Sequence, residues 1–221
     1  MTGVNLVTTG GAGFPRTWLF DFDGTLVDSV ALILDSFRHA TAMVLGSVPD
    51  DRVLMAGVGT PLREQMRGFD PDRADELTAV YREHNTLRHA DLLRPYPGVD
   101  AMLAGLRLRG CRLGIVTSKM RDAVELGMRY VPLGDFDVVV TCDDTDRHKP
   151  DPAPVLHALA QLGAPAAGAV YVGDAPYDVR AGRGAGVATA AAMWGNTFPA
   201  DVLRAERPDR ELARPEEALR W

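Results

Sequence analysis

The chain is poor in lysine and cysteine and has no long apolar run. Its 24 basic residues include only two lysines, Lys119 and Lys149. Cys111 and Cys142 are the only cysteines, each in or beside an apolar run, and no Cys/His cluster has zinc spacing, so we expect free thiols. No run of 18 apolar residues is present; we expect no transmembrane helix, no membrane partner and a cytoplasmic location.

The charge and the N-terminus exclude further classes. A formal net charge of -6 over 221 residues argues against a general nucleic-acid-binding protein. The stretch 1–15 is rich in Gly and Thr and lacks a basic region followed by an apolar one, which predicts a flexible N-terminal tail rather than a signal peptide. Nothing in the sequence distinguishes a monomer from a homodimer.

Short apolar runs alternate with amphipathic stretches over most of the chain. Strands are expected at 17–22, 112–116, 136–141, 168–173 and 186–191, with helices at 99–109, 120–130, 152–162 and 176–184. This alternation is typical of an α/β fold with a doubly wound, Rossmann-like parallel sheet. Residues 30–94 carry only helical patterns, so we expect an all-helical cap domain inserted into a core of 16–29 plus 95–221. The charged stretch 201–220 is expected to be a solvated edge.

Polar residues follow four of these strands, where ligands bind in open α/β sheets. The four clusters are Asp21-Phe-Asp23-Gly24-Thr25, Thr117-Ser118, His148-Lys149-Pro150-Asp151 and Gly173-Asp174-Ala-Pro-Tyr-Asp178. Carboxylates are ligands that Mg²⁺ prefers, so Asp21, Asp174 and Asp178, with the Asp23 carbonyl, are candidate metal ligands. Hydroxyls at a helix start and a lysine suit an anion. Candidate phosphate-binding residues are therefore Gly24, Thr117, Ser118 and Lys149.

These four clusters resemble, in order and spacing, the motifs of the haloacid dehalogenase superfamily. The resemblance implies that Asp21 is the nucleophile, Asp23 the general acid/base, and Mg²⁺ the cofactor. It also implies that the helical insertion closes over a small phosphorylated substrate. Ala175 departs from the fourth motif, where Thr, Ser or Asn usually follows the first Asp, and this weakens side-chain support around the metal.

The nearest resemblance is to the phosphoglycolate phosphatase and pyrophosphatase branch. We expect a phosphatase acting on a small metabolite, phosphoglycolate-like, through an aspartyl-phosphate; an inorganic pyrophosphatase and a catalytically silent binding module are the alternatives. A phosphonatase would need a cap lysine, and residues 30–94 contain none. Lys119 is expected to point to solvent, whereas His84 and His89 are packed or surface residues or else contact substrate.

Overall fold

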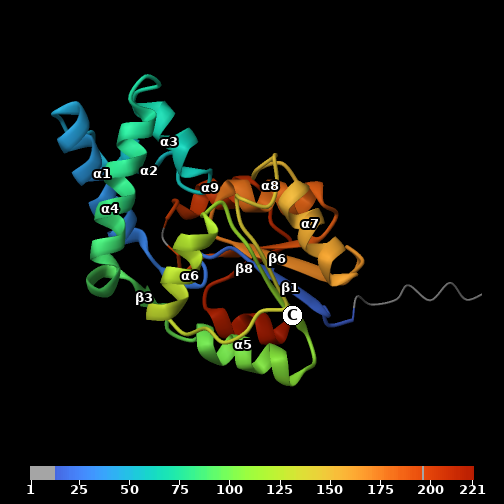
Figure 1. The fold of residues 1–221 in the computed structure, drawn as a ribbon. Coiled ribbons are helices and arrows are strands. Elements are labelled where there is room, and N and C mark those ends of the chain that lie inside the picture. The colour runs from blue at the N-terminus through green and yellow to red at the C-terminus, as the bar shows by residue number, and fades with distance from the viewer. Residues whose placement is uncertain (1–12, 196) are drawn as a thin grey trace, which may run out of the picture.

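A parallel six-stranded sheet forms the centre of the protein (Figure 1). The structure is a computed structural model that describes residues 13–195 and 197–221. The strands are β1 (Thr17–Phe20), β4 (Arg112–Val116), β5 (Val138–Val140), β6 (Ala169–Gly173), β7 (Ala188–Ala192) and β8 (Arg210–Leu212). Their order is β5-β4-β1-β6-β7-β8, and all neighbours are parallel. The predicted doubly wound fold is confirmed.

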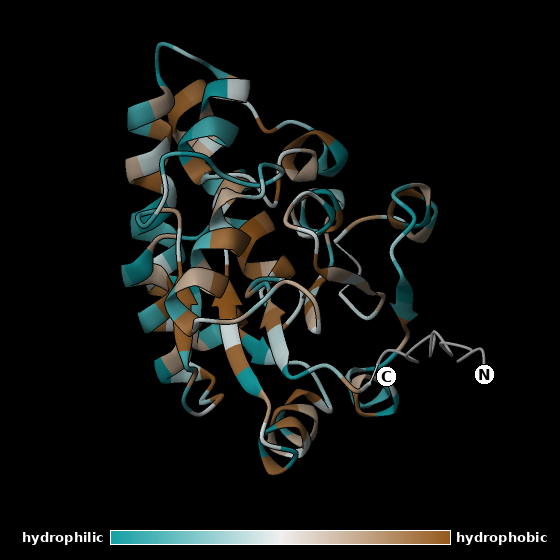
Figure 2. Cartoon of the chain, turned by 90° about the vertical axis from the view of Figure 1, so that its right-hand side faces the viewer, coloured by the Kyte–Doolittle hydropathy of each residue, from teal (hydrophilic) through white to brown (hydrophobic). Residues whose placement is uncertain are grey.

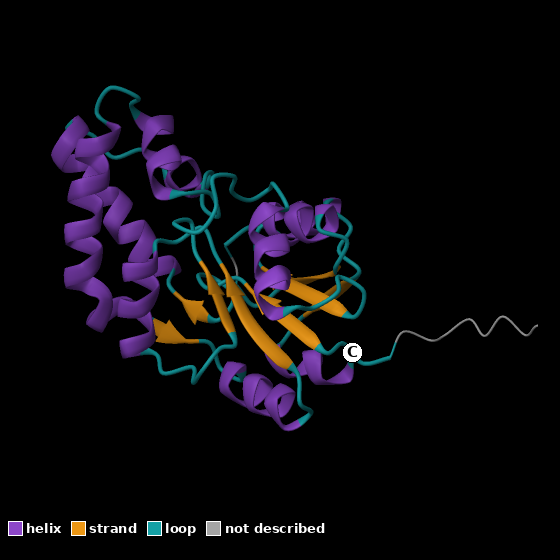
Figure 3. Cartoon of the chain, turned by 45° about the vertical axis from the view of Figure 1, so that its right-hand side comes forward, coloured by secondary structure: helices purple, strands orange, loops and turns teal. Residues whose placement is uncertain are grey.

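Helices cover both faces of this sheet (Figure 3). Successive side chains of a strand point to opposite faces, so Trp18 and Phe20 enter one apolar cluster and Leu19 enters the other. The first cluster includes residues of α5 (Val99–Leu108) and α6 (Arg121–Tyr130); the second includes residues of α7 (Ala153–Leu162) and α8 (Pro176–Gly184). Hydrophobic residues accordingly mark the strands in the interior (Figure 2).

The segment after β1 forms a helical arm beside the sheet (Figure 1). Its helices are α1 (Val30–Leu45), α2 (Asp51–Met55), α3 (Leu62–Phe69) and α4 (Ala74–Leu92). They share their own apolar cluster, in which the rings of Phe37 and Tyr81 lie 4.9 Å apart. Burying a large apolar side chain contributes about 1.5–3 kcal/mol, so this cluster holds the four helices together. We call these helices and their loops the cap.

Two short strands connect the cap to the sheet domain. β2 (Val27–Asp28) leads into α1, and β3 (Arg94–Pro95) returns from α4. The strands pair antiparallel, with Val27 opposite Pro95 and Asp28 opposite Arg94. The two chain crossings therefore lie side by side.

The C-terminal segment forms the largely exposed edge that its charges predict, but with secondary structure that they do not predict. It contains α9 (Ala200–Ala205), β8 and the 3₁₀-helix η1 (Pro215–Arg220), and β8 extends the sheet beyond β7. Leu212 and Ala218 are buried, and the Trp221 ring packs edge-on against Trp18 at 5.3 Å. The sequence did not predict β8, because Arg210 and Glu211 are charged. Charged residues are common on an edge strand, where they discourage pairing with another chain.

The N-terminal prediction is tested only in part. Residues 1–12 of the expected tail lie outside the described residues. Phe14 and Pro15, by contrast, pack on the core: the Phe14 ring lies 5.8 Å from that of Trp18, whose indole N–H donates to the Pro15 carbonyl. Cys111 is buried and Cys142 half-buried, and both are free thiols. Across 13–195 and 197–221, no helix is both long and apolar enough to cross a membrane.

Candidate active site

The carboxyl ends of three neighbouring strands bring the predicted site residues together. β1 lies between β4 and β6. The chain leaves these strands through Asp21 and Asp23, Thr117 and Ser118, and Asp174, respectively. Lys149 comes from the loop between β5 and α7, and Asp178 from the first turn of α8. Five of these side chains are buried: Asp21, Thr117, Lys149, Asp174 and Asp178.

Lys149 joins two of the buried carboxylates. Its Nζ lies 2.8 Å from Asp21 Oδ2 and 2.6 Å from Asp178 Oδ1. Burial alone would lower the pKa of Lys149, but the charges and hydrogen bonds of Asp178 and Asp21 outweigh it and raise that pKa, so the ammonium stays charged. Burial is also the main reason that the pKa of Asp21 rises to about 6, although Lys149 opposes the rise.

The three buried carboxylates fit a divalent metal ion. Asp21, Asp174 and Asp178 each offer an oxygen, and these oxygens lie within 4.8 Å of one another. Burial, with the charges of Asp178 and Asp21, raises the pKa of Asp174 well above its usual range. One lysine does not neutralise three buried carboxylates, and hard oxygen ligands are what Mg²⁺ binds. The donor set therefore matches the predicted cation.

Asp174 and Asp178 accept hydrogen bonds from different neighbours. Asp174 Oδ1 accepts a hydrogen bond from Thr25 Oγ1 at 2.7 Å. Asp178 Oδ2 accepts one from the Ala175 N–H at 2.9 Å, and Tyr171 OH lies 3.1 Å from Asp178 Oδ1. Both oxygens of Asp178 thus already have protein partners. The Ala175 backbone supplies one of them, although its side chain has no donor.

Gly24 is needed because a side chain would not fit at this position, and its backbone N–H is not free to donate to an anion. Its backbone φ is +74°, and a Cβ there would come within 2.0 Å of Asp174 Oδ2. The Gly24 N–H already donates to the Val27 carbonyl at 2.9 Å. The structure therefore places Gly24 against a candidate metal ligand, where only a glycine allows the backbone to approach.

Lys119 faces the site, and the expectation that it points to solvent is wrong. Its Nζ lies 2.8 Å and 3.0 Å from the two carboxylate oxygens of Asp23. The side chains of Lys119 and Asp23 are 12% and 19% exposed, so both are largely shielded from water. Both lysines of this lysine-poor chain therefore contact the acids that follow β1. The signal in the sequence was its position directly after Thr117-Ser118.

The two hydroxyls after β4 serve different contacts. Thr117 is buried, and its Oγ1 accepts the Lys119 N–H at 3.2 Å. Ser118 Oγ instead donates to the Gly59 carbonyl of the cap at 2.7 Å. Thr117 thus lies within the site, whereas the Ser118 hydroxyl joins the cap to the sheet domain.

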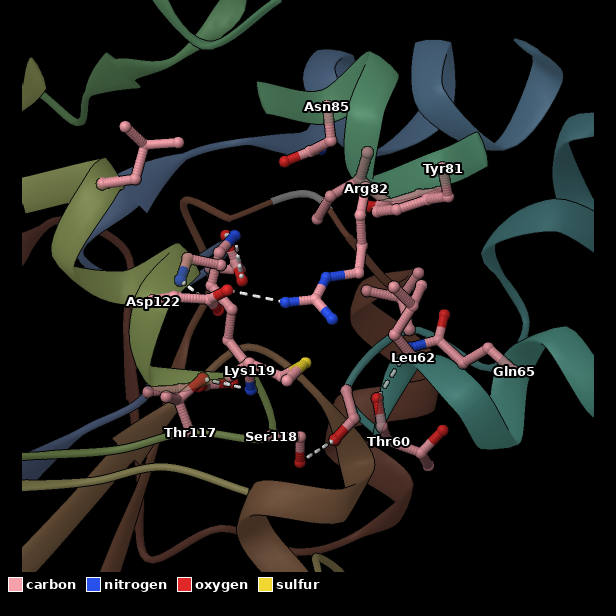
Figure 4. A pocket seen from close by; sticks show the side chains of 18 of the residues that line it. Thr60, Leu62, Gln65, Tyr81, Arg82, Asn85, Thr117, Ser118, Lys119 and Asp122 are labelled. Atoms are coloured by element: carbon pink, nitrogen blue, oxygen red, sulfur yellow. Dashed lines mark hydrogen bonds and ion pairs between the residues drawn. The ribbon is translucent and has the colours of Figure 1, made fainter. Parts of the chain in front are cut away.

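A cavity of about 420 Å³ separates the cap from the strand ends. Its floor includes Asp21, Asp23, Lys119 and Asp174, and the cap supplies residues of α3 and α4. Figure 4 shows Arg82 reaching from α4 toward Asp122 of α6, and their ion pair is 2.6 Å long. The cap lining from α4 consists of Tyr81, Arg82, Asn85, Thr86 and His89. The cap therefore encloses the space above the acids.

The two cap histidines have different surroundings. His89 is 1% exposed and lines the cavity. His84 Nε2 instead lies 2.8 Å from Asp35, and its ring stacks on His39 at 4.0 Å. His84 is thus a packed, paired residue, whereas His89 belongs to the walls of the site. Sequence spacing did not separate them, because both fall on the same long helix.

Comparisons with known proteins identify the class of protein to which this fold and this group of acids belong. A family model described as haloacid dehalogenase-like hydrolase matches residues 18–192. Pyrophosphatase PpaX of Bacillus velezensis is 38% identical over 202 residues, covering 91% of this chain and 93% of that protein. Pyrophosphatase PpaX of Bacillus pumilus is 36% identical over 205 residues, covering 92% and 94%.

The solved structures give the same fold. The crystal structure of a predicted phosphoglycolate phosphatase from Haemophilus somnus matches with a TM-score of 0.82 at 21% identity, covering 95% of this chain and 99% of that one. The chain belongs to the haloacid dehalogenase-like hydrolases and is a phosphatase of that superfamily. The resemblance of the four sequence motifs is confirmed.

Proposed function

We propose that the protein is a Mg²⁺-dependent phosphohydrolase that works through an aspartyl-phosphate on Asp21. The observation that carries this proposal is the buried Asp21 carboxylate, held 2.8 Å from the Lys149 ammonium among two further buried acids. Asp21, Asp174, Asp178 and the Asp23 carbonyl would hold the metal, with Asp178 acting also by fixing Lys149. A bound Mg²⁺ supplies positive charge to the oxygens of the phosphoryl group.

The residues of the chain account for two balanced steps. An Asp21 oxygen attacks phosphorus, the bond from phosphorus to the leaving oxygen breaks, and Asp23 gives that oxygen a proton. Water then attacks the phosphorus, Asp23 takes its proton, and the bond to Asp21 breaks to release orthophosphate. Lys149 and Thr117 stabilise the charge on the transferring oxygens. Asp23 therefore serves first as acid and then as base.

Inorganic pyrophosphate is the substrate we favour. Two relatives that span over 90% of this chain at 36% and 38% identity are named pyrophosphatases. Phosphoglycolate, which the motifs alone placed first, has weaker support, since three structures bearing that name are 26%, 21% and 20% identical. A silent binding module is disfavoured because Asp21, Asp23 and Lys149 are all present, with Lys149 beside Asp21 and with Asp21 and Asp23 lining the same cavity.

The test is a phosphate-release assay with pyrophosphate, 2-phosphoglycolate, a sugar phosphate and an aryl phosphate, with Mg²⁺ or with EDTA. We expect Mg²⁺-dependent turnover, highest with pyrophosphate, and a fall of roughly 10³-fold or more in Asp21→Asn. Asp75→Asn, on an exposed cap residue paired with Arg63, is the control and should keep full activity. Turnover by Asp21→Asn close to wild type would refute the mechanism, and no turnover of any substrate would favour the binding module.

A further inference from the structure

The position of Asp23 fixes where the leaving group must lie. A general acid has to come within about 2.6–3.2 Å of the oxygen that it protonates. Lys119 Nζ lies 2.8 Å and 3.0 Å from the two oxygens of the same carboxylate. Whatever group leaves phosphorus therefore occupies the part of the cavity within reach of the Lys119 ammonium.

His89, a residue that lines the same cavity, has a side-chain nitrogen without a hydrogen-bond partner among the described residues. Its Nδ1 lies 2.6 Å from the Asn85 carbonyl, and since a carbonyl only accepts, Nδ1 carries the proton. The Nε2 atom is buried and has no hydrogen-bond partner among the described residues. Buried polar atoms are nearly always paired, because leaving one unpaired is unfavourable. Because His89 belongs to the cavity lining, its unpaired Nε2, which a small rotation of the ring would expose, is a candidate partner for a ligand.

The charges around the cavity have different partners. Lys149 is committed to Asp21 and Asp178, beside the transferring phosphoryl group. Arg82 pairs with Asp122, and these side chains are 42% and 66% exposed. Of the cations that line the cavity, Lys119, Arg82 and Arg129, Lys119 is the shielded one beside Asp23. An ammonium has three N–H donors, and Asp23 has two oxygens to accept them, so one donor is left for another anion. Lys149 is then the cation for the transferring phosphoryl group, and Lys119 the cation for the group that leaves.

We propose that Lys119 and His89 form a subsite for an anionic leaving group, either a second phosphoryl group or a carboxylate. The inference rests on the proposed function and names the substrate class of that same site. Lys119 would bind the anion directly, and His89 would accept a hydrogen bond from a protonated oxygen or donate one after taking up a proton. When the leaving group of a phosphate ester is uncharged, Lys119 and His89 have no anion to bind.

The test compares three substrates in the presence of Mg²⁺: pyrophosphate, 2-phosphoglycolate and phenyl phosphate, whose leaving group carries no further ionised group. Lys119→Met breaks the ion pair with Asp23, and this effect alone changes the rates with all three substrates by a common factor. The readout is therefore the ratio of kcat/KM for a substrate with an anionic leaving group to kcat/KM for phenyl phosphate. We expect it to lower kcat/KM for an anionic leaving group about 10- to 100-fold more than for phenyl phosphate. Arg67→Met, which removes an exposed cap charge, should leave the ratio unchanged.

His89 gives a second reading of the same ratio. We expect His89→Phe to lower this ratio about tenfold and His89→Gln to recover part of the loss, because an amide can again accept or donate a hydrogen bond. His89 is buried, so thermal unfolding checks each variant; if His89→Phe does not fold, Lys119→Met and His89→Gln decide.

The outcomes separate this inference from the proposed function. A selective loss with pyrophosphate assigns the subsite to a second phosphoryl group, and a selective loss with 2-phosphoglycolate assigns it to a carboxylate. An equal loss with all three substrates overturns the subsite while the phosphohydrolase proposal stands. Absence of Mg²⁺-dependent turnover by the wild-type protein overturns both.

Discussion

Replacing Lys149 by methionine should destabilise the fold as well as stop the reaction. The ammonium is 1% exposed and lies 2.8 Å from Asp21 and 2.6 Å from Asp178, whose side chains are 6% and 2% exposed. Lys149→Met keeps most of the volume of the side chain but leaves two buried carboxylates without their cation. Removing one partner of a buried ion pair costs about 3–5 kcal/mol, a large part of the roughly 5–15 kcal/mol that stabilises a typical domain.

Urea unfolding at pH 7.5 in EDTA measures this loss. We expect the midpoint to fall by about 1–2 M, with an unchanged slope. Adding Mg²⁺ should recover part of the loss, because a cation bound only to the folded state neutralises the same acids.

The matched control lies on the same loop. Arg147 pairs with Asp151 at 3.2 Å, but its side chain is 73% exposed. Exposed ion pairs contribute little, so Arg147→Met should cost less than about 1 kcal/mol. If Lys149→Met costs no more than this control, the buried acids do not depend on Lys149 for their neutralisation, and the reasoning is refuted.

Two further predictions concern the acid site and the cap. Gly24→Ala should disable the metal site, because its Cβ would lie 2.0 Å from Asp174 Oδ2. The positive φ adds about 1–2 kcal/mol of strain. A titration of turnover with Mg²⁺ should therefore show weaker binding of the ion. His89 should make the fold less stable in acid. Burial, the main cause, and Lys119 lower the pKa of His89, opposed by a backbone hydrogen bond and Asp23. As pH falls below about 6.5 the unfolded state therefore binds the proton first, and the stability of wild type relative to His89→Gln should fall by up to about 1.4 kcal/mol per pH unit.

Each of these has a comparison variant that isolates the cause. Gly163→Ala also has a positive φ, +58°, but its Cβ meets nothing within 4 Å, so it should weaken the fold without changing the Mg²⁺ response. His157→Gln replaces a half-buried histidine of α7 that pairs with Gln161, and it is the matched variant against which the pH slope of His89→Gln is compared. Equal Mg²⁺ responses of the two glycine variants, or a pH slope unaffected by His89→Gln, would contradict the assignments.

The alternation of apolar runs with amphipathic stretches predicted five strands of the sheet, and the polar residues at their ends predicted the buried acids of the site. Asp21, Asp174 and Lys149 follow apolar runs, and parallel strands must bring such ends to one edge of a sheet. Lys119 was missed because residue type and spacing do not determine where a flexible side chain points; its ion pair with Asp23 depends on the path of the chain after β4. The Ser118 hydroxyl was assigned to phosphate, yet it bonds to the cap, whose position no local pattern encodes.

The C-terminal segment shows a different limit. A three-residue strand with two charged residues, Arg210 and Glu211, has no detectable alternation, and only pairing with β7 makes it a strand. The packing of Trp221 against Trp18 joins the last residue to the first strand, a contact between distant parts of the sequence. Such tertiary contacts override local propensity.

Because β2 and β3 pair with each other, the cap is a single loop whose two ends lie side by side where it joins the sheet domain. Its two ends meet at Asp28 and Arg94, so the entropy of closing that loop depends only weakly on what lies between them. Insertions, deletions or a different set of helices can therefore replace the cap at little thermodynamic expense to the sheet. The part of the cavity wall that the cap supplies can then change while the acids that follow the strands stay in place.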